Sequence, residues 1–135
     1  MSEMLIYEGK FSDGEVKIVL EKEKKLLKTV AHGVLSGKDM QGWLEALSKE
    51  LKNHDKNELL YLHDGTGTDM KIFNADQTKM ANEAIKYISM NAKKSAVVYT
   101  SFVHQKSHAA SVGGELPGNM KYFNSVQEAT KWLLA

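Results

Sequence analysis

The sequence contains no cysteine and a single proline, Pro117, and its charges nearly cancel. Without cysteine there is no disulfide framework, no thiolate metal site and no cysteine nucleophile. The 18 lysine and arginine residues stand against 17 aspartate and glutamate residues, a formal net charge of +1. No global field therefore draws the chain to nucleic acid or to an anionic membrane. These absences exclude a disulfide-stapled scaffold and disfavour a nucleic-acid reader.

Long hydrophobic runs are also missing. No apolar stretch approaches the roughly 20 residues that span a bilayer, and the opening MSEMLIYEGKF lacks the basic and apolar regions of a secretory signal. We therefore expect a cytoplasmic protein without a membrane span. The 135 residues fit one domain, residues 1–135, with enough buried surface for a core of its own.

The sequence does contain clear strand patterns. Val16, Ile18 and Leu20 recur at every second residue, which is typical of a strand with one buried face. A second β-rich run follows at residues 26–35, and the two are predicted to form an antiparallel hairpin. Further strands are predicted at residues 4–11, 59–62, 95–102 and 120–123.

Helices are predicted where apolar residues recur at helical spacing behind a polar cap. The expected caps are Ser36 with Asp39, Asn74 with Gln77, and Ser125 with Glu128. A further short helix is predicted at residues 104–112. This order of elements predicts an α/β domain whose mixed sheet has four or five strands, the antiparallel hairpin first and the parallel strands after it.

The carboxyl-terminal stretch YFNSVQEATKWLL resembles the SpoIIAA-like group of the STAS superfamily. The matching residues are Tyr122, Phe123, Glu128, Ala129, Trp132 and Leu133, preceded by a helix and a strand between residues 81 and 99. The resemblance extends from about Val16 onward. It implies a sheet of four or five strands with helices mainly on one face, and a role as a protein-interaction or small-ligand module.

One motif of that superfamily is missing from this chain. In the superfamily that this chain resembles, the anti-anti-sigma members are switched by phosphorylation of a serine. That serine lies in a D-S-S-G-like loop at the start of a central helix. The equivalent residues 73–78 (FNADQT) contain no serine, and only Asp76 and Thr78 compare with the motif. The resemblance therefore points to a regulatory module without the usual phosphoserine, and it supplies no substrate.

The most distinctive polar segment, HDGTGTD, is predicted to be a loop after the strand at residues 59–62. Ligands of open α/β sheets bind beyond the carboxyl ends of the strands. Glycine amides and threonine hydroxyls at such a place favour an anion near a helix start. The alternative is a turn whose glycines need positive φ and whose Asp and Thr cap it locally. The candidate binding residues are Asp64, Gly65, Thr66, Gly67, Thr68, Asp69, Asn74, Ser101 and His104.

Two histidines have a spacing that metal sites use. His104 and His108 are four residues apart, which places both imidazoles on one face of a helix, and His63 or Asp64 would complete a zinc-type site if the loops converge. The residue after His104 is Gln105, where zinc hydrolases usually carry glutamate. Surface histidines on a short helix are the alternative interpretation.

Three functions are compatible with these patterns. The leading hypothesis is a non-enzymatic STAS-like regulatory or protein-interaction module that binds a protein partner or a second copy of itself near residues 64–69. The second is a carrier or sensor of a small apolar or anionic ligand, held in a pocket between sheet and helices. A metal-assisted hydrolase built on His63, Asp64, His104 and His108 ranks last. The leading hypothesis needs no catalytic residue, no metal ion and no cofactor.

Overall fold

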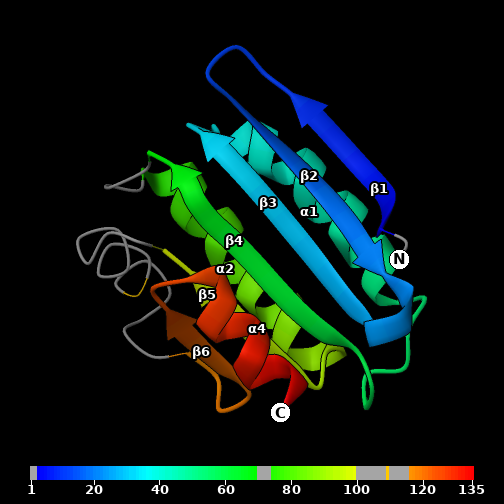
Figure 1. Ribbon diagram of the computed structural model, residues 1–135. Coiled ribbons are helices and arrows are strands. Elements are labelled where there is room, and N and C mark those ends of the chain that lie inside the picture. Colours follow the sequence, from blue (N-terminus) through cyan, green and yellow to red (C-terminus); the bar gives the residue numbers. More distant parts are fainter. Residues whose placement is uncertain (1–2, 70–73, 100–108, 110–115) are drawn as a thin grey trace.

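The fold is a mixed β-sheet with helices on both faces (Figure 1). This computed structural model describes residues 3–69, 74–99, 109 and 116–135. Within these residues the strands are β1 (Glu3–Lys10), β2 (Gly14–Glu21), β3 (Leu26–Gly33), β4 (Leu60–Thr68), β5 (Lys94–Val98) and β6 (Met120–Phe123). They lie in the sheet in the order β1-β2-β3-β4-β5-β6. β2 is antiparallel to both of its neighbours, β1 and β3, and the strands from β3 to β6 run parallel to one another.

The mixed α/β sheet is confirmed, but the predicted number of four or five strands is too low. Six strands belong to one sheet, because both edge segments pair along their length. β1 pairs with β2 from Glu3 to Lys10, and β6 pairs with β5 from Met120 to Phe123. The predicted hairpin is therefore the inner part of a three-stranded antiparallel meander.

Three helices of the described residues connect or close the sheet: α1 (Gly37–Leu51), α2 (Ala75–Asn91) and α4 (Val126–Leu134). The first two begin with complete capping boxes, as predicted. Ser36 and Asp39 exchange bonds at the start of α1, and Asn74 and Gln77 at the start of α2. α4 has half of the predicted box, in which the Ser125 hydroxyl accepts from the Glu128 amide at 3.2 Å.

Two hydrophobic clusters hold the layers together, one on each face of the sheet. The larger packs α1 and α2 against one face and includes Trp43, Tyr61 and Ile88. The smaller packs Ala129 and Leu133 of α4 against Leu60, Leu62 and their neighbours on the other face. Figure 1 shows α1 and α2 behind the sheet and α4 in front of β4 to β6. The helices therefore lie mainly on one face, as predicted, and α4 leaves the front of β1 and β2 uncovered.

The predicted loop after residue 62 is wrong, because β4 continues to Thr68. Its second half keeps pairing with β3, where Val30 lies opposite Asp64 and His32 opposite Gly67. A bulge between these pairs takes up the extra residue and bends the strand. The described part of the strand predicted at residues 95–102 ends at Val98, and of the helix predicted at residues 104–112 only Ala109 is described, as helical.

No helix in the described ranges is long and apolar enough to cross a membrane.

Candidate functional site

A small apolar pocket lies between the sheet and the two helices behind it. Its volume is about 40 Å³, above the roughly 10–15 Å³ that a cavity needs to hold a water molecule. The sheet, α1, α2 and the segments next to them contribute its side chains: Val16, Ala31, Leu35, Met40, Trp43, His63, Thr68, Ala81, Ala84, Ile85, Ile88, Val97 and Tyr99. His63 and Thr68, both from β4, are the polar side chains of this lining apart from the aromatic N–H and O–H groups. The pocket therefore suits a mainly apolar occupant with a polar group directed to β4.

A buried chain of hydrogen bonds runs from Trp43 and Thr29 through Tyr61 to His63 in the pocket lining. The Thr29 hydroxyl, fully buried in β3, accepts from the Trp43 indole N–H at 3.0 Å and from the Tyr61 hydroxyl at 2.6 Å. The Tyr61 oxygen lies 3.3 Å from Nδ1 of His63. The chain exists because Tyr61 and His63 are two residues apart in β4 and so lie on the same face of the sheet.

The contact with Tyr61 orients His63. The Tyr61 hydroxyl donates to Thr29, and its oxygen also lies within hydrogen-bond reach of Nδ1 of the imidazole. The strand thus gives the imidazole a defined orientation.

Three aromatic rings surround the imidazole of His63. Its centroid lies 5.6 Å from that of Trp43, 6.4 Å from Tyr61 and 6.2 Å from Tyr99, with edge-on or tilted geometry. Burial raises the pKa of Tyr61 well above its usual value, and hydrogen bonding to Thr29 opposes this only in part. Burial likewise raises the pKa of Tyr99, and the neighbouring tyrosines add to the effect. Both phenols are therefore neutral hydroxyl groups at neutral pH.

Gly65 allows the Tyr99 ring to lie against β4. A Cβ atom at this position would overlap Cε1 of Tyr99 and lie 2.7 Å from its Cδ1. Gly67 has the same relation to the His32 imidazole on β3. The positive φ expected for these glycines is wrong, since Gly33 is the described glycine with that conformation, at 73°. Both glycines serve close side-chain approach inside a strand.

The other predicted binding residues of β4 are engaged with one another. The Asp64 carboxylate accepts from the Thr66 amide at 3.0 Å and from the Thr66 hydroxyl at 2.6 Å. The Thr68 hydroxyl donates to the Gly65 carbonyl at 2.6 Å and also lines the pocket. The Asp69 amide donates to the Gly33 carbonyl at 2.9 Å. The local capping predicted for Asp and Thr is present, although in a bulged strand.

Asn74 caps α2, and this use of its side chain ties it to the helix. Its oxygen accepts from the Gln77 amide at 2.8 Å, and the Gln77 side chain accepts from the Asn74 amide at 2.9 Å. Ser101, His104 and His108 lie outside the described residues.

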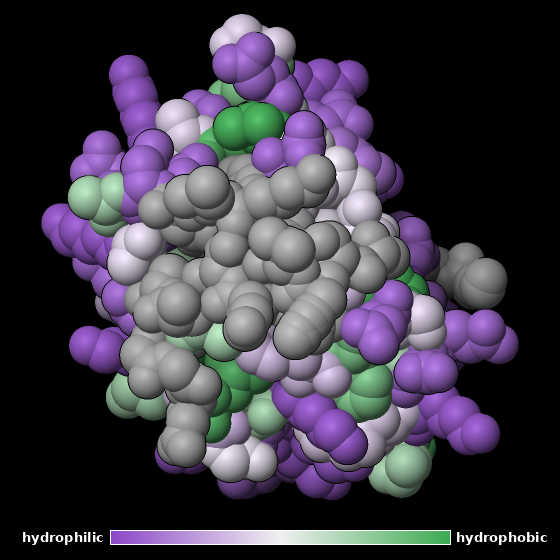
Figure 2. Space-filling model, turned by 90° about the vertical axis from the view of Figure 1, so that its left-hand side faces the viewer, coloured by the Kyte–Doolittle hydropathy of each residue, from purple (hydrophilic) through white to green (hydrophobic). Residues whose placement is uncertain are grey.

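Figure 2 shows the molecule from the left-hand side of Figure 1, where the coloured surface is mostly hydrophilic and hydrophobic side chains form small separate areas.

The proposed metal set is not supported by the position of its described members. His63 and Asp64 are successive residues of β4, so their side chains lie on opposite faces of the sheet. His63 contacts Trp43 of α1, whereas Asp64 pairs with Val98, whose side chain packs in the cluster under α4. Across the part of the chain that the structure describes, no three His, Asp or Glu residues are placed to hold a metal ion.

The sequence reasoning missed Trp43, Tyr99 and Thr29 as members of the site. The helical spacing of Trp43 with Met40, Leu44 and Leu47 predicts a core position, and its ring also lines the pocket. The available signal was His63 itself. A polar residue two positions after Tyr61, on the face that the helices cover, predicts a polar group facing the apolar layer.

Comparison with protein families gives one match. The family model described as SpoIIAA-like matches residues 26–134, which run from β3 to the end of α4. No curated protein matches the sequence.

Proposed function

This chain belongs to the SpoIIAA-like family, and from that premise we propose that it is a non-enzymatic binding module that takes a small, mainly apolar ligand between its sheet and α1 and α2. The family suggests a regulatory or interaction role, and the observation that favours a ligand is the apolar pocket around His63.

Three properties of the pocket support the proposal. Its lining is chiefly aliphatic and aromatic, as in most small-ligand sites. His63 has a fixed orientation through Tyr61, so a ligand meets an ordered polar group. The volume of about 40 Å³ restricts a ligand that enters without rearrangement to a few heavy atoms, at roughly 10–15 Å³ per water-sized group.

The first experiment is native mass spectrometry of the protein purified from its own host under gentle desolvation. A reproducible small-molecule adduct is the expected result. In parallel, xenon serves as a defined probe of the recombinant protein, because apolar cavities of this kind bind it without specific chemistry. The xenon chemical shift is expected to change with protein concentration.

A pocket-filling variant identifies where the probe binds. Ala84 of α2 lines the pocket and is buried, so Ala84→Leu should remove both the xenon response and the adduct. The matched control is Ala46→Leu, a substitution on α1 that packs against the same core outside the pocket lining. An adduct-free protein, together with equal xenon responses in the native chain and in the Ala84→Leu variant, would contradict the proposal.

A second candidate function is the binding of a protein partner at the end of β4 and the start of α2. The observation that favours it is a cluster of exposed polar residues there, in which Thr66 and Asp69 of the β4 end lie on the surface with Asn74 and Asp76. The residues assigned to this surface from the sequence, Asp64–Asp69 with Asn74, Ser101 and His104, would then contact the partner. Pull-down with the Asp69→Lys/Asp76→Lys variant as negative control tests it: equal capture of all proteins by both forms argues against this surface.

A further inference from the structure

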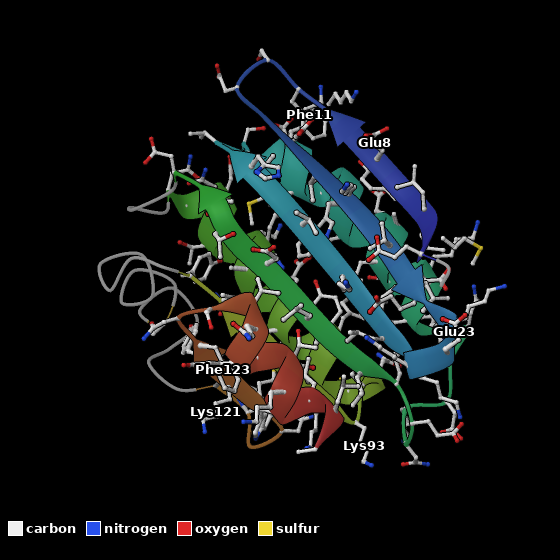
Figure 3. All side chains as sticks on the ribbon, in the orientation of Figure 1. Glu8, Phe11, Glu23, Lys93, Lys121 and Phe123 are labelled. Carbon is white, nitrogen blue, oxygen red and sulfur yellow. The ribbon has the colours of Figure 1, made fainter. Side chains whose placement is uncertain are left out.

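Among the described residues no strand pairs with the outer edge of β1, and the sequence of this edge is self-complementary. β1 is the first strand of the sheet, with β2 on one side only. Its last residues and the one after it read Tyr7-Glu8-Gly9-Lys10-Phe11, which places an acid and a base on either side of a glycine and an aromatic residue at each end. Figure 3 shows Glu8 and Phe11 along this edge, far from Lys93 and Lys121.

The backbone groups of Glu8 and Lys10 point away from β2. The Phe11 amide donates to the Gly14 carbonyl at 2.9 Å, which makes Phe11 a hydrogen-bonded position of the hairpin. Gly9 and Tyr7 follow at every second residue, opposite Val16 and Ile18. Because hydrogen-bonded and non-hydrogen-bonded positions alternate in antiparallel pairs, the amides and carbonyls of Glu8 and Lys10 face the free edge.

The side chains along this edge of β1 alternate between the two faces of the sheet. Glu8 and Lys10 are exposed on the face that α4 leaves uncovered, beside Lys17 and Glu15 of β2 respectively. Within the described residues, neither belongs to an ion pair. Tyr7 and Phe11 are half-buried on the α1 face, where both rings lie over the buried Gly9.

We propose that β1 pairs antiparallel with β1 of a second copy of this chain, with Gly9 opposite Gly9 on the two-fold axis. In this register Glu8 meets Lys10 of the other copy, and the two residues exchange backbone hydrogen bonds. Tyr7 meets Phe11 on the α1 face. One row of side chains then crosses the joined edges with alternating charge. Glu15 and Lys10 of one copy are followed by Glu8 and Lys17 of the other. The two sheets become one continuous sheet.

The charges select this register over its neighbours. A shift of two residues keeps the backbone pairing but brings Glu8 against Glu8, or Lys10 against Lys10, which is unfavourable for directly opposed side chains. The bulge between Leu5 and Tyr7 ends the regular edge on one side, and the turn after Phe11 ends it on the other. The same charges and bulge that protect an edge from general aggregation thus permit one short, specific pairing.

Charge reversal provides the test, measured by sedimentation over a wide range of protein concentrations. The native chain is expected to form a dimer whose dissociation constant rises with salt. Glu8→Lys and Lys10→Glu are each expected to raise that constant about tenfold or more. The reason is that a two-fold dimer contains each Glu8–Lys10 contact twice, so one substitution places like charges opposite each other at two positions. The double variant Glu8→Lys/Lys10→Glu should dimerise as the native chain does.

A mixture of the two single variants gives the sharpest result. One copy then presents two lysines and the other two glutamates, so the mixture should form heterodimers at concentrations where each variant alone dimerises only weakly. Lys93→Glu, a reversal at the other side of the sheet, is the matched control and should leave the dimer unchanged. Thermal unfolding shows that each exposed-site variant is folded. A native chain that is monomeric at all concentrations, or a dimer that the two reversals leave intact, overturns the proposal. It stands independently of the ligand pocket, since Ala84→Leu should not affect it.

Discussion

Gly65 affects the pocket through Tyr99, whose ring lies against it and belongs to the pocket lining. Glycine here is not a turn residue, because it lies inside β4 with Tyr99 packed on its Cα. Composition alone predicts a loop from Gly65, Gly67 and the threonines around them. The strand forms because the backbone still pairs with β3, and the missing side chains admit the rings of Tyr99 and His32.

Gly65→Ala is expected to destabilise the fold by about 1–3 kcal/mol, the usual cost of adding an atom to a packed site. The new Cβ would overlap the Tyr99 ring, which must move into the pocket or out of the core. Urea unfolding of Gly65→Ala measures the cost. Gly118→Ala is the control, because a Cβ at Gly118 meets nothing within 4 Å.

A second substitution, at Tyr99, tests whether the overlap with its ring causes the cost of Gly65→Ala. If the overlap with Tyr99 is the cause, Gly65→Ala should cost much less in a Tyr99→Leu background than in the native chain. Additive costs for the two substitutions would show that Gly65 acts through the backbone instead.

At the scale of elements, the helix starts were the most predictable part of the chain. Ser36 with Asp39 and Asn74 with Gln77 form the boxes that their three-residue spacing predicts. The sequence does not reveal that Gln77 is also buried and donates to the Leu35 carbonyl at 2.7 Å. That bond joins α2 to the segment before α1, and a contact over so long a sequence separation leaves no local pattern.

Asn74→Ala is expected to lower the free energy of unfolding by about 1 kcal/mol, the usual value of an N-cap. Gln77→Ala should cost more, about 2–3 kcal/mol, because it also removes the buried hydrogen bond that the Gln77 side chain donates to the Leu35 carbonyl. Chemical denaturation of both variants, with Ser125→Ala at α4 as a cap-only comparison, gives the three values. Equal losses for Asn74→Ala and Gln77→Ala would mean that the bond to Leu35 contributes little.

At the scale of the whole molecule, the layers followed from sequence and the pocket did not. Period-two and helical patterns place apolar side chains on a face, so the sheet and its covering helices are predictable. The pocket depends on how tightly α1 and α2 approach the sheet, which small residues such as Ala31, Ala81 and Ala84 determine. The position of α4 was not predictable either, because no local pattern in the sequence says which strands this helix covers.

Burial of the tyrosines predicts how the whole fold responds to alkali. The pKa values of Tyr61 and Tyr99 are raised above the ordinary 10.0 in the folded state. Below about pH 10 both states hold the phenol proton, so the stability is fully present there. Above it the unfolded chain loses protons that the folded chain keeps, so stability should fall by about 3 kcal/mol per pH unit for the two residues together.

Phenolate absorbance and circular dichroism recorded together on raising the pH provide the measurement. Part of the phenolate signal should appear only as the dichroism is lost, in one cooperative step. A phenolate signal that is complete while the dichroism remains native would show that the buried tyrosines ionise in place, and the tight ring cluster around His63 would then be wrong.

The order of the strands in the sheet is the same as their order in the chain. A chain emerging from the ribosome can therefore add each new strand to the edge that the previous one has just formed. No strand has to wait for a later one to be inserted beside it, and no finished pair has to open. During synthesis the growing edge is always the most recent strand, so the nascent sheet is exposed for pairing with other chains at that edge only until the next strand arrives. β1 is the exception, because none of the described strands that follow it is added to its outer edge.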